Sequence, residues 1–338
     1  MRLTATECLV GATLAAVALP ALPSKAQSPP ASPPDSASIW SIQGENASLT
    51  TSALPDRDYT NGIRLGWTSA EGGAPEPLER LGQRLWGDGR QRIAVDATQQ
   101  IYTPTDSNSV SPKLNDRPYA AVLLGTVSLI QDGADTRSVL ALGLGVVGPS
   151  ALGDQVQNGF HDLIDQNPKR GWNTQLHDEP LIEITSARSW RLPTGAVGAV
   201  ATDAVPEITA AVGNLRIYAQ TGVIFRLGQG LDSDYGAPRL LPGQTGTDVF
   251  RPTRPFGWYV FAGADAQAVG YDITLNGNTW QDSRSVKLVP AVAELEGGFA
   301  VMTAGLRLTY THVMQTLEYA HQRGGLHQFG SLALSLRF

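Results

Sequence analysis

Long segments of alternating apolar and small or polar residues run through this chain. Between residues 58 and 68, aromatic and aliphatic side chains take the odd positions, and Thr60, Gly62 and Arg64 are among the even ones. The same alternation recurs near 303–311 and 331–338. Successive side chains of a strand point to opposite faces, so each segment has one apolar and one polar face. The segments run to about 9–12 residues, longer than the ~5–6 usual in soluble sandwiches, which favours strands that cross a bilayer around a polar lumen.

We therefore expect an all-β fold, an antiparallel up-and-down transmembrane β-barrel of about 12 strands. An even number is what a closed single-chain bacterial barrel requires, and closure leaves no unpaired edge in lipid. The last candidate strand is long enough to include a turn near Gly324-Gly325, and the chain ends on the aromatic Phe338. The candidates lie near 38–49, 57–70, 92–104, 117–131, 136–148, 178–192, 198–213, 214–228, 256–270, 285–298, 299–312 and 316–338.

The connections between these strands differ in length. A short one is expected at 193–195, and long ones at 71–91, 105–116, 149–177, 229–255 and 271–284. Outer-membrane barrels have short turns at one end and long loops at the other, and the lengths fit that asymmetry. We expect a helical turn around Leu78, Leu81 and Leu85 in the 71–91 connection, and a short helix in an extracellular loop.

The start of the chain reads as an export signal. A short basic end precedes an apolar run, and Ser24-Lys25-Ala26 has a small-x-small cleavage pattern, so 1–26 is assigned as a signal peptide. Residues 27–37 form a Pro/Ser-rich linker expected to lack packed structure, and 38–338 form the barrel. The one cysteine, Cys8, lies in the signal, which excludes a disulfide scaffold. A net charge of −6 without a basic run argues against a nucleic-acid partner.

Within the stretch 140–172, the spacing of the apolar residues changes from the period of two of a strand to the period of a helix. From residue 153 to 166 the apolar positions Val156, Phe160, Leu163 and Ile164 form the stripe of a short amphipathic helix. His161 shares a face with Gln157 and Asp165, four residues to either side. An amide and a carboxylate beside a histidine suit a general base, although a solvated loop histidine gives the same pattern.

Three further segments are richer in polar residues than a barrel wall needs: Glu45-Asn46, residues 56–62 and residues 116–120. Thr60 shares its face with Arg64, the lumen face, so we expect its hydroxyl inside the barrel near one end. Strict alternation points Asn46 outward, and only a bulge or the strand end would turn it inward. The two Asp-Arg pairs in these segments also fit simple ion pairs, and Asn46 also fits a turn.

These blocks together resemble the outer-membrane lipid A 3′-O-deacylase family across roughly residues 38–338. The resemblance implies a twelve-stranded barrel in the outer membrane of a Gram-negative bacterium. Its site would face the outer leaflet, between the wall and a loop helix, and act on lipid A, the membrane anchor of lipopolysaccharide. Carried over by motif, the catalytic residues are His161, Thr60 and Asn46, with Gln157, Asp165 and Glu45 in support. The motifs are Glu45-Asn46, Asp56-Arg57-x-Tyr59-Thr60-Asn61-Gly62, Asp116-Arg117-Pro118-Tyr119-Ala120, Gly148-Pro149-Ser150-Ala151-x-Gly153, Val156-Gln157-Asn158-x-x-His161, Gly171-Trp172, Glu179-Pro180 and Pro206 to Gly213-Asn214.

The resemblance implies that the 3′-linked acyloxyacyl chain is removed by a water that the histidine deprotonates. Calcium and polar side chains would stabilise the oxyanion. Two positions depart from the family pattern: Ala47 replaces an aspartate, and Asn167 replaces an acid found in some members. Calcium binding would then be weaker or pass to Glu45 or Asp58, and Asp165 could orient His161.

Two other functions stay open on the sequence. The first is a catalytically inactive barrel that binds lipopolysaccharide or serves structurally, which Ala47 supports. The second is a small-molecule porin, although Arg64, Arg307 and other long side chains would help to fill a twelve-stranded lumen. Nothing in the strand faces marks a subunit interface, so we expect a monomer.

Overall fold

The computed structural model describes residues 33–50, 57–240 and 247–338. The expected signal peptide, 1–26, and most of the expected linker lie outside the described residues. The described end of the linker is packed against the barrel. Asp35 is 4% exposed and pairs with Arg92 of the wall and with Arg337 near the C-terminus. The expectation of an unpacked linker is therefore wrong for this end of it.

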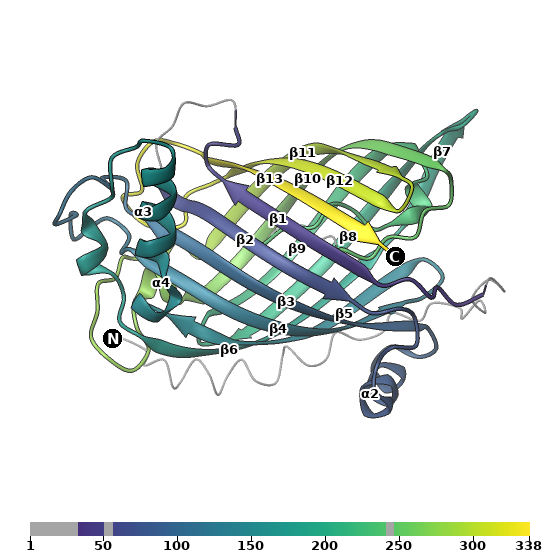
Figure 1. Ribbon diagram of the computed structural model, residues 1–338, viewed down its shortest axis with the longest axis horizontal. Helices are drawn as coiled ribbons and strands as arrows, with labels where there is room; N and C mark the ends of the chain where they lie inside the picture. Colours follow the sequence, from purple (N-terminus) through teal and green to yellow (C-terminus); the bar gives the residue numbers. More distant parts are fainter. Residues whose placement is uncertain (1–32, 51–56, 241–246) are drawn as a thin grey trace.

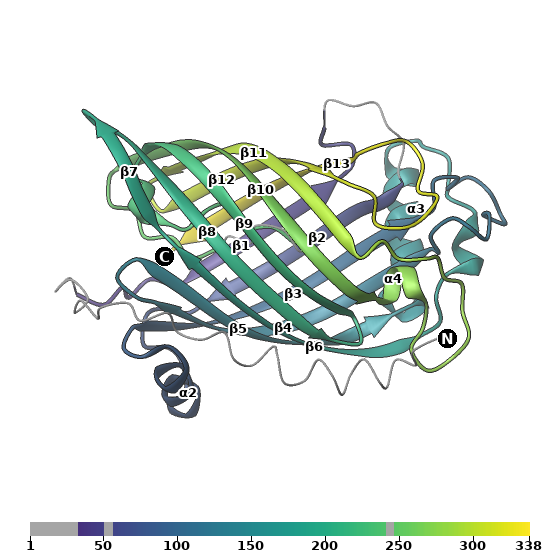
Figure 2. The same ribbon diagram turned by 180° about the vertical axis from the view of Figure 1, so that it is seen from behind.

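Twelve antiparallel strands close into a barrel (Figures 1 and 2). Apart from β6 and β7, strands that are neighbours in sequence pair with one another, β1 pairs with β13, and a β6–β8 pairing completes the circle. The predicted all-β barrel of about twelve strands is thus confirmed. The strands are β1 (Ile39–Asn46), β2 (Asp58–Thr68), β3 (Arg90–Thr103), β4 (Ala120–Asp132), β5 (Thr136–Val147), β6 (Glu179–Trp190), β7 (Leu192–Val197), β8 (Val200–Gly213), β9 (Arg216–Gln229), β10 (Phe256–Asp272), β11 (Ala291–Thr303), β12 (Leu306–Gln315) and β13 (His327–Arg337).

The short strand β7 pairs only with β8, and the two form a hairpin that projects beyond the wall (Figure 2). The predicted turn at 193–195 is therefore wrong, because these residues belong to β7 and the chain reverses at Gly198. The last three predicted strands begin between about six and eleven residues too early. β11 and β12 meet at Ala304 and Gly305, which both have positive φ, as a two-residue hairpin turn requires.

In the part of the chain that the structure describes, three α-helices lie between wall strands: α2 (Glu76–Trp86), α3 (Gly153–Leu163) and α4 (Ile273–Asn276). Helix α2 confirms the helical turn predicted in the 71–91 connection. Among the described residues, no helix is long and apolar enough to cross a membrane. We call the end of the barrel that holds the start of β1 and the end of β13 the terminal end, and the opposite end, where α3 and α4 lie, the distal end (Figure 1).

Connection lengths do not divide cleanly between these two ends. The short turns 133–135, 198–199 and 304–305 lie at the terminal end, but so do the long connections 69–89 and 230–255, and the two-residue turn 214–215 lies at the distal end. The predicted asymmetry is wrong for these two long segments. The first carries α2. The second folds back into the barrel, which a length count cannot reveal.

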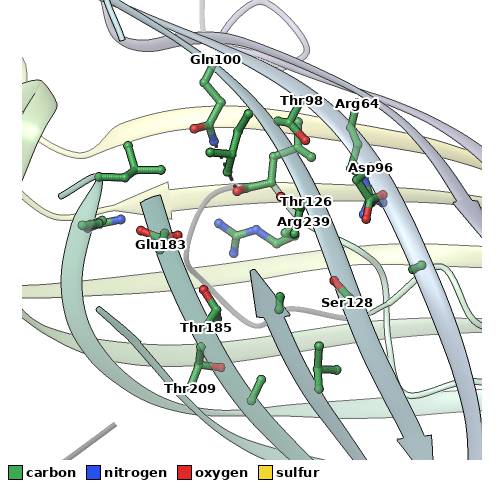
Figure 3. A pocket seen from close by; sticks show the side chains of 18 of the residues that line it. Arg64, Asp96, Thr98, Gln100, Thr126, Ser128, Glu183, Thr185, Thr209 and Arg239 are labelled. Carbon is green, nitrogen blue, oxygen red and sulfur yellow. Dashed lines mark hydrogen bonds and ion pairs between the residues drawn. The ribbon is translucent and has the colours of Figure 1, made fainter. Parts of the chain in front are cut away.

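The described parts of the 230–255 connection, residues 230–240 and 247–255, form a plug that is held in the lumen by buried ion pairs. Its Asp234 accepts from Arg226 at 2.6 Å and from Arg307 at 3.1 Å. Its Arg239 donates to Glu294 at 2.9 Å and to Glu296 at 3.0 Å. A polar cavity of about 250 Å³ remains between this plug and the wall strands β3–β6 and β8 (Figure 3). Buried polar groups need hydrogen-bond partners, and the plug and the wall provide these partners for each other.

Candidate active site on the outer wall

The tip of the plug contacts the inner side of the wall at the distal end of β1 and β2. Glu45, at the end of β1, is fully buried in the lumen. Its carboxylate accepts a hydrogen bond from the Tyr59 hydroxyl at 3.0 Å, from the Leu240 backbone N–H at 2.9 Å and from Gln43 at 3.2 Å. We call the group formed by Glu45, Tyr59 and Leu240 the inner brace. It ties two neighbouring wall strands to the plug.

Gly62 explains part of the Tyr59-Thr60-Asn61-Gly62 block. The Tyr59 ring lies directly over it, and a Cβ on Gly62 would overlap the Tyr59 hydroxyl and come within 2.9 Å of Leu240. The ring can therefore reach Glu45 only across a residue without a side chain. This glycine is required by close approach rather than by an unusual backbone angle.

A β-bulge at Thr60 changes the direction of the candidate threonine. Tyr59 pairs with Tyr102 and Asn61 with Ile101, so Thr60 is the extra residue on β2. Its hydroxyl lies 2.7 Å from that of Thr103, and Thr60 is 2% exposed. Tyr59 and Gly62 both face the lumen with two residues between them. The expectation that Thr60 shares the lumen face with Arg64 is therefore wrong, because it assumed alternation without a bulge.

Asn46 follows the alternation of β1 and lies on the outer face, as strict alternation predicts. Its side-chain amide donates to the Asn61 side chain at 3.2 Å, and its carbonyl oxygen accepts from the Ser48 backbone N–H at 2.7 Å. Asn61 is its direct partner on β2. The motif thus divides by face, with Glu45 and Tyr59 in the inner brace and Asn46 and Asn61 outside.

Helix α3 packs against the outer wall through the face that carries Gln157 and His161. Gly153, Gln157 and His161 are its buried residues, and the Gln157 side-chain carbonyl accepts from the Trp172 indole N–H at 3.0 Å. The helix packs on β3 and β4, over a cluster that includes Ile101 and Trp172. The pairing of Ile101 with Asn61 puts this cluster beside the outward-facing amides. The structure thus brings α3, Asn46 and Thr60 to the same distal part of the wall, next to β1–β3 (Figure 1).

A backbone carbonyl group contacts the His161 ring. Its Nδ1 lies 3.0 Å from the Asn167 carbonyl oxygen, and it is 5% exposed. A carbonyl can only accept, so Nδ1 carries the proton and Nε2 of the neutral ring carries the lone pair. Asp165 is exposed, has a φ of 57° and lies past the end of the helix, and its role in orienting the ring stays a prediction. No sequence signal identifies a backbone acceptor of this kind.

The two candidate metal ligands lie on the lumen side with other partners. Glu45 belongs to the inner brace, and Asp58 accepts from Tyr319 at 3.2 Å and lies near His327. Ala47 presents only a methyl group and is 4% exposed. Across 33–50, 57–240 and 247–338, no three His, Cys, Asp or Glu side chains gather where they could hold a metal. The residues at the outer site offer amide and hydroxyl groups, a poor match to the carboxylate oxygens that calcium prefers.

Comparisons with known proteins agree with this architecture. The family model described as outer membrane protein LpxR matches residues 9–338. The solved structure of LpxR from Salmonella typhimurium superposes with a TM-score of 0.73 at 21% identity, covering 89% of this chain and 100% of that one. The β domain of the Bordetella autotransporter BrkA gives only 0.45 at 11% identity, covering 90% and 100%, and carries no argument. No curated protein matches. With its family match over nearly the whole length, this chain belongs to the LpxR family of outer-membrane proteins of Gram-negative bacteria.

Proposed function

We propose that this protein is a lipid A deacylase that hydrolyses the ester holding the 3′-linked acyloxyacyl chain. One observation carries the proposal. A short helix holds a buried histidine against the outer wall at the distal end, and the outward-facing Asn46 amide and the Thr60 hydroxyl lie at the same end of the wall. An ester buried among acyl chains can approach an outer wall, whereas a soluble substrate would enter a lumen, and this lumen is plugged.

In the proposed reaction, His161 Nε2 removes a proton from a water, which attacks the ester carbonyl carbon. The Asn167 carbonyl accepts from Nδ1–H throughout and stabilises the imidazolium that forms. Asn46 and Thr60 supply the amide and hydroxyl groups for the developing oxyanion. The alcohol leaves with the proton returned from His161. Calcium is implied by the family resemblance, but the donor set does not suit it, and no step above depends on it.

A second function is favoured by Ala47 and Asn167, which replace two acidic positions of the family pattern. On this alternative the barrel retains the fold and binds lipopolysaccharide without hydrolysing it.

Mass spectrometry of lipid A from cells expressing the chain separates the two functions. The wild type should lose the mass of one acyloxyacyl chain, and His161→Ala should not. His177→Ala is the matched control, because His177 is an exposed histidine of the same loop and should behave as the wild type. Loss only in Ala47→Asp would mean that the native chain is inactive for want of a carboxylate. No loss in any variant, with all of them folded in the outer membrane, would leave the binding function.

A further inference from the structure

Helix α3 is amphipathic, but its apolar stripe does not face the wall. Phe160 is 54% exposed and Leu163 is 81% exposed, whereas Gln157 and His161 are buried. At about 100° per residue, the apolar stripe of Val156, Phe160 and Leu163 lies ~90° around the helix from the buried line. A soluble loop would bury this stripe, so its exposure calls for an apolar surrounding.

The opposite flank of α3 is polar and is covered by the protein itself. Asn158 exchanges two hydrogen bonds with the backbone of Lys169, at 2.7 and 3.0 Å. Just beyond Lys169, Gly171 lies close to Tyr119 and Pro112, which belong to a distal loop. The polar flank therefore faces the distal loops, and the apolar flank faces back along the barrel toward the middle of the wall.

The surface reached by the apolar flank is the lipid-facing belt of the barrel. Val156 packs against the cluster that contains Ala121. Two residues further along β4 on the same face is Leu123, which is exposed like its neighbours Leu144 and Ile182. Helix α3 crosses the strand ends rather than following them (Figure 1). Its apolar flank is thus continuous with the belt of a protein that belongs to an outer-membrane family.

We propose that α3 is an interfacial helix whose apolar flank, Val156, Phe160 and Leu163, is immersed in the acyl chains of the outer leaflet. Such helices lie in the plane of the membrane with the apolar face ~5–10 Å into the boundary region. The polar flank stays among the distal loops. Because this proposal concerns membrane depth alone, it stands whether or not the protein hydrolyses lipid A.

Paramagnetic relaxation of a spin label measures that depth. The full chain in a Cys8→Ser background, which removes its single cysteine, would carry one nitroxide at Leu163→Cys or at the matched control Asp162→Cys. Both positions are exposed, so neither label disturbs packing. The protein is reconstituted in dimyristoylphosphatidylcholine vesicles, and its collisions with oxygen and with a water-soluble nickel chelate are compared.

The ratio of oxygen to nickel accessibility should be severalfold higher at residue 163 than at residue 162. Equal and high nickel accessibility at both positions would place the flank in water and overturn the proposal. Low accessibility to both reagents at residue 163 would mean that protein covers it, which also overturns the proposal.

Discussion

The inner brace gives a quantitative test of how the lumen supports the outer site. Tyr59→Phe removes the hydroxyl that donates to Glu45 at 3.0 Å, in a place where both side chains are fully buried. The Glu45 carboxylate keeps its hydrogen bonds to Leu240, Gln43 and Ser331 but loses the one from the Tyr59 hydroxyl. A hydrogen bond to a charged group contributes roughly 1.5–3 kcal/mol, so we expect the free energy of unfolding to fall by about 2 kcal/mol.

The assay is urea unfolding of the protein in lipid vesicles, followed by tryptophan fluorescence. With a slope of ~3 kcal/mol/M, a loss of about 2 kcal/mol lowers the midpoint by ~0.7 M at an unchanged slope. Tyr271→Phe is the control, because its partly exposed hydroxyl meets only neutral partners, Gly277 and Thr279, and should cost below ~1 kcal/mol. If Tyr59→Phe costs no more than Tyr271→Phe, the inner brace does not stabilise the wall and the reasoning is refuted.

Three other predictions follow from the geometry. Burial raises the pKa of Glu318 from 4.5 to about 7, although nearby guanidinium groups act to lower it. Glu318 therefore adds stability below about pH 4.5 that is lost as the pH rises toward 7. Glu318→Gln should flatten the dependence of the unfolding free energy on pH over that range, and an unchanged slope would contradict this pKa. Gly153→Val places carbon atoms against the Trp172 ring, and it should abolish deacylation while the barrel still migrates as folded on gels. Gly159→Val is the control and should stay active, because the space around Gly159 is open. Equal activity of the two variants would show that close packing of α3 on the wall is not required. The plug, residues 230–240 and 247–255, is held across the lumen by buried ion pairs, so the protein should show no conductance in a planar bilayer, and steady open channels would contradict this.

The strand pattern was readable in the sequence because each wall residue meets one of only two environments. Lipid outside and a polar lumen inside impose a period of two, and twelve segments show it. Boundaries near residues 285–338 were misplaced because alternation continues through short turns such as Ala304-Gly305. The plug was missed because its inward course depends on ion pairs with strands that are distant in sequence, such as Arg239 with Glu294.

The candidate site was only partly predictable for a similar reason. Asn46 obeys alternation, so its direction was readable. The direction of Thr60 depends on a bulge, which adds one residue without changing the composition of the strand. The support of His161 comes from the Asn167 backbone, and every residue has such a carbonyl, so no residue type identifies it.

The sequence by itself determined the barrel, its strand number and the motif residues, because periodicity and local spacing are properties of neighbouring positions. Tertiary structure alone decided which face each motif residue takes, where segment 230–255 goes and how α3 is turned. Its apolar stripe looked like a core-facing stripe, but it lies on the outside of the barrel wall, where the surrounding solvent is lipid. What an apolar side chain faces depends on the surroundings of the folded wall, which no local pattern records.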